Sequence, residues 1–186
     1  MRKFNITDFC VLIVALALQL STMKYYYSLP RLWSPMIDLS SGIFAVEYFA
    51  NPAVPVLAVC TAAILALRFR GPRPSLRFLG RQPGFAACVC AILVVSARLA
   101  FSQAAWQAGT RLGLLPSVDW PDRLFIEFPG IATGGGFAIM SAWAIAARGR
   151  LFRPSADWVE RAGRIIGCLW IACAFYYSSV YATHWK

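Results

Sequence analysis

Five long apolar segments alternate with short polar stretches along the chain. None of them alternates apolar and polar residues with period two, so the strands of a β-barrel are not expected. A helix rises 1.5 Å per residue, so about 20 residues cross the ~30 Å hydrocarbon core of a bilayer. We therefore predict an all-α integral membrane protein, a single transmembrane domain over residues 1–186, with spans at about 8–27, 42–67, 84–106, 125–147 and 161–182.

Two of these segments allow more than one interpretation. Pro52 and Pro55 predict that the second helix is kinked there, or that it starts near Asn51. The first segment follows Arg2 and Lys3 as a signal peptide would. It lacks a clean cleavage site of small residues, which favours a retained helix over a cleaved leader.

The basic residues predict how the chain is oriented. Twelve of the 18 lysines and arginines lie before the first segment, between the second and third, or between the fourth and fifth together with the first turn of the fifth. Five lie on the other side, and Arg98 lies inside a span. The positive-inside rule then places the N-terminus in the cytoplasm and the C-terminus outside, as five spans require. We expect a multi-pass protein of the cell membrane, the plasma or inner membrane in a bacterium.

Composition supports this class. The chain is 59% hydrophobic and 14% charged, against about 45–50% and about 25% in soluble domains. A formal charge of +10 would suggest nucleic acid in a soluble protein. Here the bases lie between apolar segments, where membrane orientation requires them. We expect the lipid bilayer as partner, with other helices or a second copy as open alternatives, and no nucleic acid.

The residues that usually carry catalysis or bind metals are scarce. All six cysteines lie in apolar segments without a CxxC pair, and the only histidine is His184. A metal site of the Cys/His type needs ligands at a characteristic spacing, and a nucleophile–base pair needs a His or Lys near a Ser or Cys. We expect no metal and no cofactor, and the balance is against an enzyme.

Arg98 is the one cation more than a turn away from the ends of a predicted span. Counted along its helix it lies near the outer boundary, at a depth similar to that of Glu47 and Glu127. Three interpretations stay open: Arg98 reaches the outer headgroups, it forms an ion pair with one of these acids, or it lines an outward-facing pocket with them and Tyr177.

Small residues recur on two segments. Gly130, Gly134, Ala138 and Ala142 follow one another every fourth residue, and Gly163 and Gly167 form a GxxxG pair. Such faces let helices approach closely in a membrane. The partner, within the chain or outside it, stays open.

The fifth segment begins with a capping pattern. Asp157 is a candidate N-cap, and Glu160 three residues later completes a capping box. Arg161 and Arg164, with Trp158, form either a corner that binds lipid headgroups or an ordinary interfacial anchor.

These patterns together favour a non-catalytic accessory or structural membrane protein that packs against other helices or lipid. The alternative is a small transporter subunit or membrane-embedded enzyme with an outward-facing polar pocket around Arg98.

Overall fold

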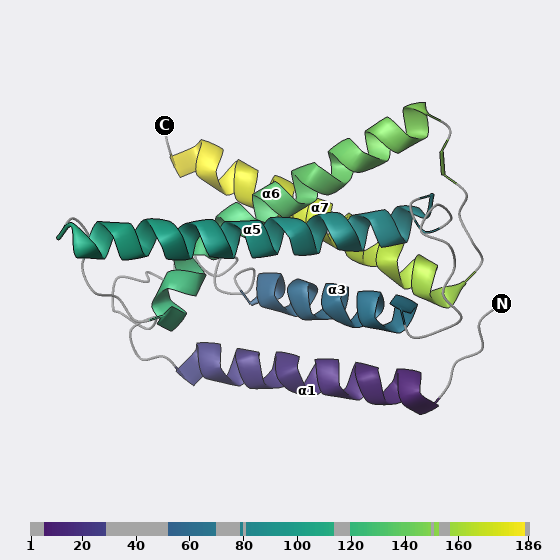
Figure 1. Cartoon of the computed structure of the whole chain (residues 1–186), viewed down its shortest axis with the longest axis horizontal. Coiled ribbons are helices and arrows are strands. Elements are labelled where there is room, and N and C mark those ends of the chain that lie inside the picture. Colours follow the sequence, from purple (N-terminus) through teal and green to yellow (C-terminus); the bar gives the residue numbers. More distant parts are fainter. Residues whose placement is uncertain are drawn as a thin grey trace.

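Five helices make up the described part of the chain, as seen in a computed structural model (Figure 1). The structure describes residues 6–28, 52–69, 79, 81–113, 120–149, 151–152 and 157–184. The helices are α1 Ile6–Ser28, α3 Ala53–Phe69, α5 Pro83–Arg111, α6 Trp120–Arg148 and α7 Trp158–His184. The predicted all-helical class is therefore confirmed.

The five helices alternate in direction, so α1, α5 and α7 begin at the same end of the bundle at which α3 and α6 finish (Figure 1). Helices α5, α6 and α7 pack closely on one another. Helix α3 lies against α5 and α7, and α1 packs mainly on α3. Helix α1 is thus the outermost member of the bundle.

Three helical stretches in the described residues are long and apolar enough to cross a membrane. They are Pro83–Arg111, Glu127–Arg148 and Trp158–Val180. Two shorter apolar stretches, Ile6–Ser21 and Ala53–Phe69, accompany them. With 29 residues, helix α5 is about 43 Å long and exceeds the ~30 Å hydrocarbon core.

Local chemistry explains where two of these helices begin or end. Helix α3 starts at Ala53, directly after Pro52, and Pro55 falls in its first turn, where no backbone donor is lost. Helix α5 runs beyond the predicted end at 106 to Arg111. Gly113 then takes a positive φ of 68°, a conformation that suits glycine just past a helix end.

The interior is centred on Trp170 of α7, which is fully buried. Its indole Nε1–H donates to Thr61 Oγ1 of α3 at 3.0 Å, and the Thr61 hydroxyl donates to Leu57 O. On the α6 side the ring lies against Gly135, where a Cβ would be only 3.1 Å from the indole. Gly135 therefore makes room for this indole, the largest core side chain, and Thr61 accepts its hydrogen bond.

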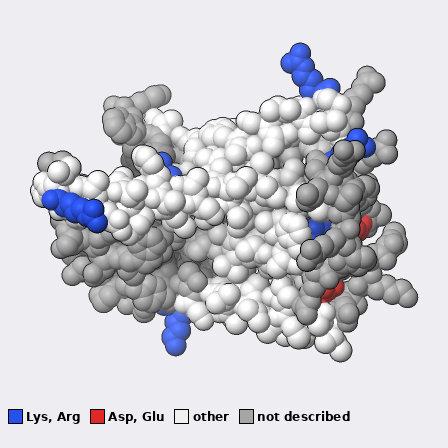
Figure 2. All heavy atoms as spheres, viewed as in Figure 1, with Lys and Arg blue, Asp and Glu red and all other residues white. Residues whose placement is uncertain are grey.

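The outer surface of the bundle is strongly apolar. On the face seen in Figure 2 the middle of the molecule is white, and the coloured charged residues lie mostly toward its two ends. Large apolar side chains are exposed on all five helices, among them Phe9, Phe69, Leu93, Phe101, Phe137, Ile145, Ile165 and Phe175. Water does not stabilise such a surface, whereas hydrocarbon does.

Candidate functional site

Arg98 of α5 is engaged with an acid of α6. Its Nε donates to Glu127 Oε2 at 2.8 Å. The other oxygen of Glu127 accepts from Ser102 Oγ at 2.9 Å, one turn further along α5. The Arg98 side chain is 47% exposed and that of Glu127 is 17% exposed. The two groups form a charge-assisted pair at the surface of the bundle.

A glycine supports this pair. A Cβ on Gly130 would lie 3.0 Å from an Nη of Arg98, so the guanidinium rests on the bare backbone of α6. One turn later, Gly134 faces Val94 of α5. The first two members of the small-residue series thus face α5 within the same chain. Ala138 and Ala142 are partly buried.

The structure does not gather the whole predicted pocket. Glu47 lies outside the described residues. Tyr177 is 3% exposed and belongs to the core cluster with Phe128 and Ile131. It packs edge-on against the ring of Tyr176. Of the four predicted residues, only Arg98 and Glu127 are shown in contact.

A second polar cluster lies at the opposite end of the bundle, where α5 and α7 begin. The carboxylate of Glu160 in α7 accepts hydrogen bonds from the backbone N–H groups of Gly84 at 2.6 Å and Phe85 at 3.3 Å. These are among the first N–H groups of α5, which have no partner in their own helix. The positive end of the helix dipole also favours a carboxylate there. Glu160 therefore caps α5.

This contact corrects the predicted capping box. Asp157 does cap α7, since its Oδ1 accepts from Val159 N at 3.3 Å. Glu160 does not complete the box by bonding back to Asp157, because its two carboxylate oxygens accept hydrogen bonds from N–H groups of α5. The physical reason is close approach: Gly163 lies against the backbone of Gly84, which brings the two helix starts together.

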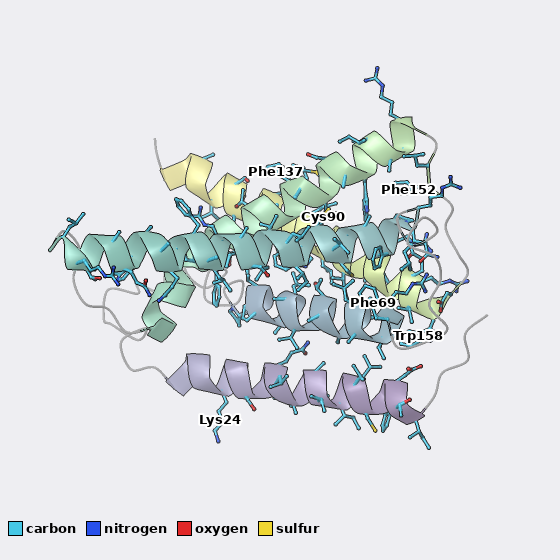
Figure 3. The ribbon with its side chains drawn as sticks, in the orientation of Figure 1. Lys24, Phe69, Cys90, Phe137, Phe152 and Trp158 are labelled. Carbon is cyan, nitrogen blue, oxygen red and sulfur yellow. The ribbon has the colours of Figure 1, made fainter. Side chains whose placement is uncertain are left out.

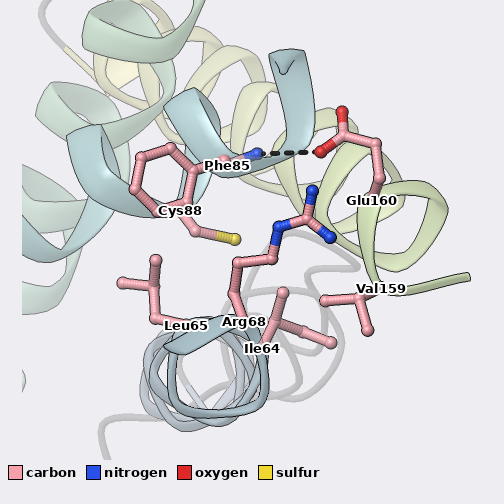
Figure 4. Close-up of a pocket in the computed structure, with 7 residues that line it drawn as sticks. All are labelled: Ile64, Leu65, Arg68, Phe85, Cys88, Val159 and Glu160. Carbon is pink, nitrogen blue, oxygen red and sulfur yellow. Dashed lines mark hydrogen bonds between the residues drawn. The ribbon is translucent and has the colours of Figure 1, made fainter. Parts of the chain in front are cut away.

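Arg68, at the end of α3, joins the same cluster. Its Nη1 forms an ion pair with Asp157 Oδ2 at 2.5 Å. In Figure 4 the side chains of Arg68 and Cys88 converge on a small cavity below Glu160. The cavity has a volume of about 10 Å³, room for one water molecule. The Nε of Arg68 is buried there without a hydrogen-bond partner among the described residues.

The predicted headgroup residues divide between two faces of α7. Arg161 and Arg164 line an open groove between α6 and α7. Trp158 packs instead with the cluster of Ile64, Leu67 and Val159. Figure 3 shows it at the same end of the bundle as Phe69, while Lys24 points away from the bundle near the other end of α1.

Glycines of α6 and α7 allow the helices α5, α6 and α7 to approach one another closely. Gly167 faces Ala87 of α5 and the ring of Trp143, whose indole N–H donates to Pro83 O at 2.9 Å. Gly163 and Gly167 therefore face α5 and α6 within the chain. Gly136, which lies outside the predicted small-residue series, meets Ala174 and the carbonyl of Trp170.

The chemistry available in this part of the chain is ionic. Among the described residues no group of three or more His, Cys, Asp or Glu side chains is placed to hold a metal ion. The six cysteines form no disulfide. The arrangement can hold buried and half-buried charges in fixed positions and can present two arginines beside an apolar groove.

Sequence reasoning missed the partner of Glu160 and the roles of Arg68 and Gly84. The one available indication is the acid at the start of α7 beside the glycine pair, a pattern that by itself predicts only a local cap. Compared with known proteins, the chain matches no family model, no curated protein and no solved structure.

Proposed function

We propose that this chain is a small multi-pass protein of the cell membrane that acts without catalysis, as an accessory or structural component packing against other helices or lipid. The observation that carries the proposal is the apolar outer surface. Long side chains such as Leu93, Phe101 and Ile145 are exposed around the bundle, and contiguous surfaces of this kind mark contact with membrane or protein.

The proposal includes five spans, with the N-terminus in the cytoplasm and the C-terminus outside. Helices α1 and α3 are apolar and alternate in direction with the three longer ones (Figure 1). The end at which α5 and α7 begin carries Arg68, Arg81, Arg148 and Arg161 among the described residues. Excess Lys and Arg is retained on the cytoplasmic side of membranes.

The pocket alternative has weaker support. Tyr177 packs in the core, and Arg98 is engaged with Glu127 across a glycine. This geometry favours an ion pair that ties α5 to α6 over an open site awaiting a solute.

Topology is tested by labelling single cysteines in a variant without the six native ones. A cysteine at position 2 should react with a membrane-impermeant thiol reagent only after the cells are opened. A cysteine at position 186 should react in intact cells. Labelling of both from the same side would contradict five spans.

The function is tested in two assays on the full chain. Purification in mild detergent, followed by identification of what co-purifies, should recover defined helical membrane proteins or lipids. The chain is also placed in liposomes and assayed for solute uptake. Transport that is lost in Arg98→Leu would overturn the accessory role in favour of the pocket.

A further inference from the structure

An open groove runs along the outside of the bundle where α6 and α7 meet. Its volume is about 650 Å³, within the range of about 300–1,000 Å³ typical of small-molecule sites. Trp143 forms the α6 wall. The α7 wall consists of residues three and four apart, which share one face of a helix: Arg161, Arg164, Ile165, Cys168, Leu169 and Ala172.

The lining of the groove is almost entirely apolar, and its two charged residues lie at one end. Both arginines lie in the first two turns of α7, and the remaining α7 residues are apolar. From Arg161 to Ala172 the helix rises about 16 Å, roughly half of the ~30 Å hydrocarbon core. The groove therefore has the length of one leaflet, with its charge at the end of the helix.

Neither arginine forms a close ion pair with an acid in the part of the chain that the structure describes. Arg161 is exposed, and the Nε of Arg164 is buried without a hydrogen-bond partner. The carboxylate of Glu160 attracts Arg164, but its oxygens are bonded to the N–H groups of Gly84 and Phe85 and lie beyond ion-pair distance of the guanidinium. The head of the groove thus carries the exposed charge of Arg161, together with that of Arg164, which Glu160 offsets only from a distance.

We propose that the groove binds one anionic phospholipid, with its phosphate on Arg161 and Arg164 and one acyl chain lying along α7 as far as Ala172. Guanidinium groups hold phosphate oxygens in paired hydrogen bonds. A zwitterionic lipid is bound more weakly, because its own cation opposes the arginines. This inference rests on the membrane location in the proposed function.

A second copy of the chain fits the groove less well. A symmetric contact through it would bring four arginines together with no acid among the lining residues. Like charges facing one another across an interface cost several kcal/mol. The lipid is therefore the occupant that the charge favours.

The test uses the full chain in detergent, mixed with equal amounts of phosphatidylglycerol and phosphatidylcholine. Native mass spectrometry counts the lipids retained. We expect phosphatidylglycerol to be preferred, and R161Q/R164Q to reduce that preference about 25-fold, roughly fivefold per arginine. The matched control is R81Q/R148Q, which removes the same charge from exposed arginines at the same end of the bundle and should keep the preference.

The acyl end of the groove is tested separately. Ala172→Trp fills the groove without changing charge and should reduce retention of both lipids while leaving their ratio unchanged. Phosphatidylglycerol carrying a photoreactive acyl chain should crosslink to the segment containing Ile165, Cys168 and Leu169. Circular dichroism checks that each variant stays helical, and if the double variant does not fold, R161Q alone should show the fivefold loss.

Equal losses in R161Q/R164Q and R81Q/R148Q would overturn the proposal, since the effect would then be diffuse surface charge. Crosslinks between two copies through this segment would overturn it as well, in favour of a dimer. Failure of the proposed membrane location looks different: alkaline carbonate would then release the chain from membranes. A chain that stays in the membrane but shows no lipid preference contradicts only this inference.

Discussion

At the scale of single residues, Glu160 caps the first N–H groups of α5, a role that usually belongs to the residue just before a helix. Gln82 occupies the N-cap position of α5 and makes no side-chain cap. The glutamate that caps the helix instead lies 76 residues after Gly84 and is only 2% exposed. A carboxylate is well suited to this position because it accepts two N–H bonds and carries negative charge.

Replacing Glu160 by glutamine should therefore destabilise the protein. The amide keeps one acceptor oxygen but turns an NH₂ group toward backbone donors and removes the charge. We expect the free energy of unfolding to fall by about 1–2 kcal/mol, measured by unfolding in detergent. Arg148→Gln, the loss of an exposed charge at the same end, should change it by less than about 0.5 kcal/mol. Equal effects would contradict the capping role.

The pair of Arg98 and Glu127 predicts non-additive mutations. Each single change, Arg98→Met or Glu127→Gln, leaves a partner without its counter-charge, whereas the double variant leaves neither. The coupling energy should be about 0.5–1 kcal/mol, because Arg98 is half exposed. A double-mutant cycle on unfolding in detergent measures it. Strict additivity would mean that the contact contributes nothing.

At the scale of elements, the glycines of α6 differ in what they face. Gly136 meets the backbone of α7, with the carbonyl of Trp170 2.6 Å from the position of a Cβ. Gly134 meets only the side chain of Val94, at 3.2 Å. Backbone cannot move without shifting the whole helix, while a valine can adjust by a small rotation.

Gly136→Ala should accordingly separate α6 from α7 and lower the free energy of unfolding by more than about 2 kcal/mol. Gly134→Ala is the matched control two residues away. It should be neutral or slightly stabilising, because alanine favours a helix by up to about 1 kcal/mol over glycine. Thermal unfolding of both variants in the same detergent decides this. The same loss in both would show that the two contacts are equivalent.

The helices themselves could be predicted because each is a long apolar run, and such runs are an unambiguous local pattern. Even the start of α3 after Pro52 follows from local chemistry. The position of Glu160 could not be predicted in this way. Its partner depends on how closely Gly163 approaches Gly84, a contact between distant segments that no single stretch of sequence contains. The partner of Arg98 could be predicted in part, because the sequence narrows it to two candidates, Glu47 and Glu127.

At the scale of the whole molecule, the outer surface should behave as a surface in contact with lipid. Leu93 lies near the middle of α5 and is 63% exposed, while Leu112 lies just past its end and is 71% exposed. In water the two would tolerate arginine equally well. In a membrane, Leu93→Arg should cost about 2.5–3.5 kcal/mol of insertion free energy, and Leu112→Arg should cost little. The fraction of protein inserted into membranes measures both, and equal insertion would contradict contact of α5 with lipid.

The capping of α5 by Glu160 also orders events during synthesis. Helix α5 leaves the ribosome well before α7 exists, so its first N–H groups enter the membrane boundary with only water or headgroups as partners. Arg68 likewise lacks its ion-pair partner until Asp157 is synthesised. Arrest of translation after α6 should leave a nascent chain whose α5 start is readily attacked by protease. Once the last thirty or so residues are synthesised, Glu160 and Asp157 can reach their partners, and the start of α5 should become protected from protease. Helix α7 is therefore the last element needed to complete the bundle.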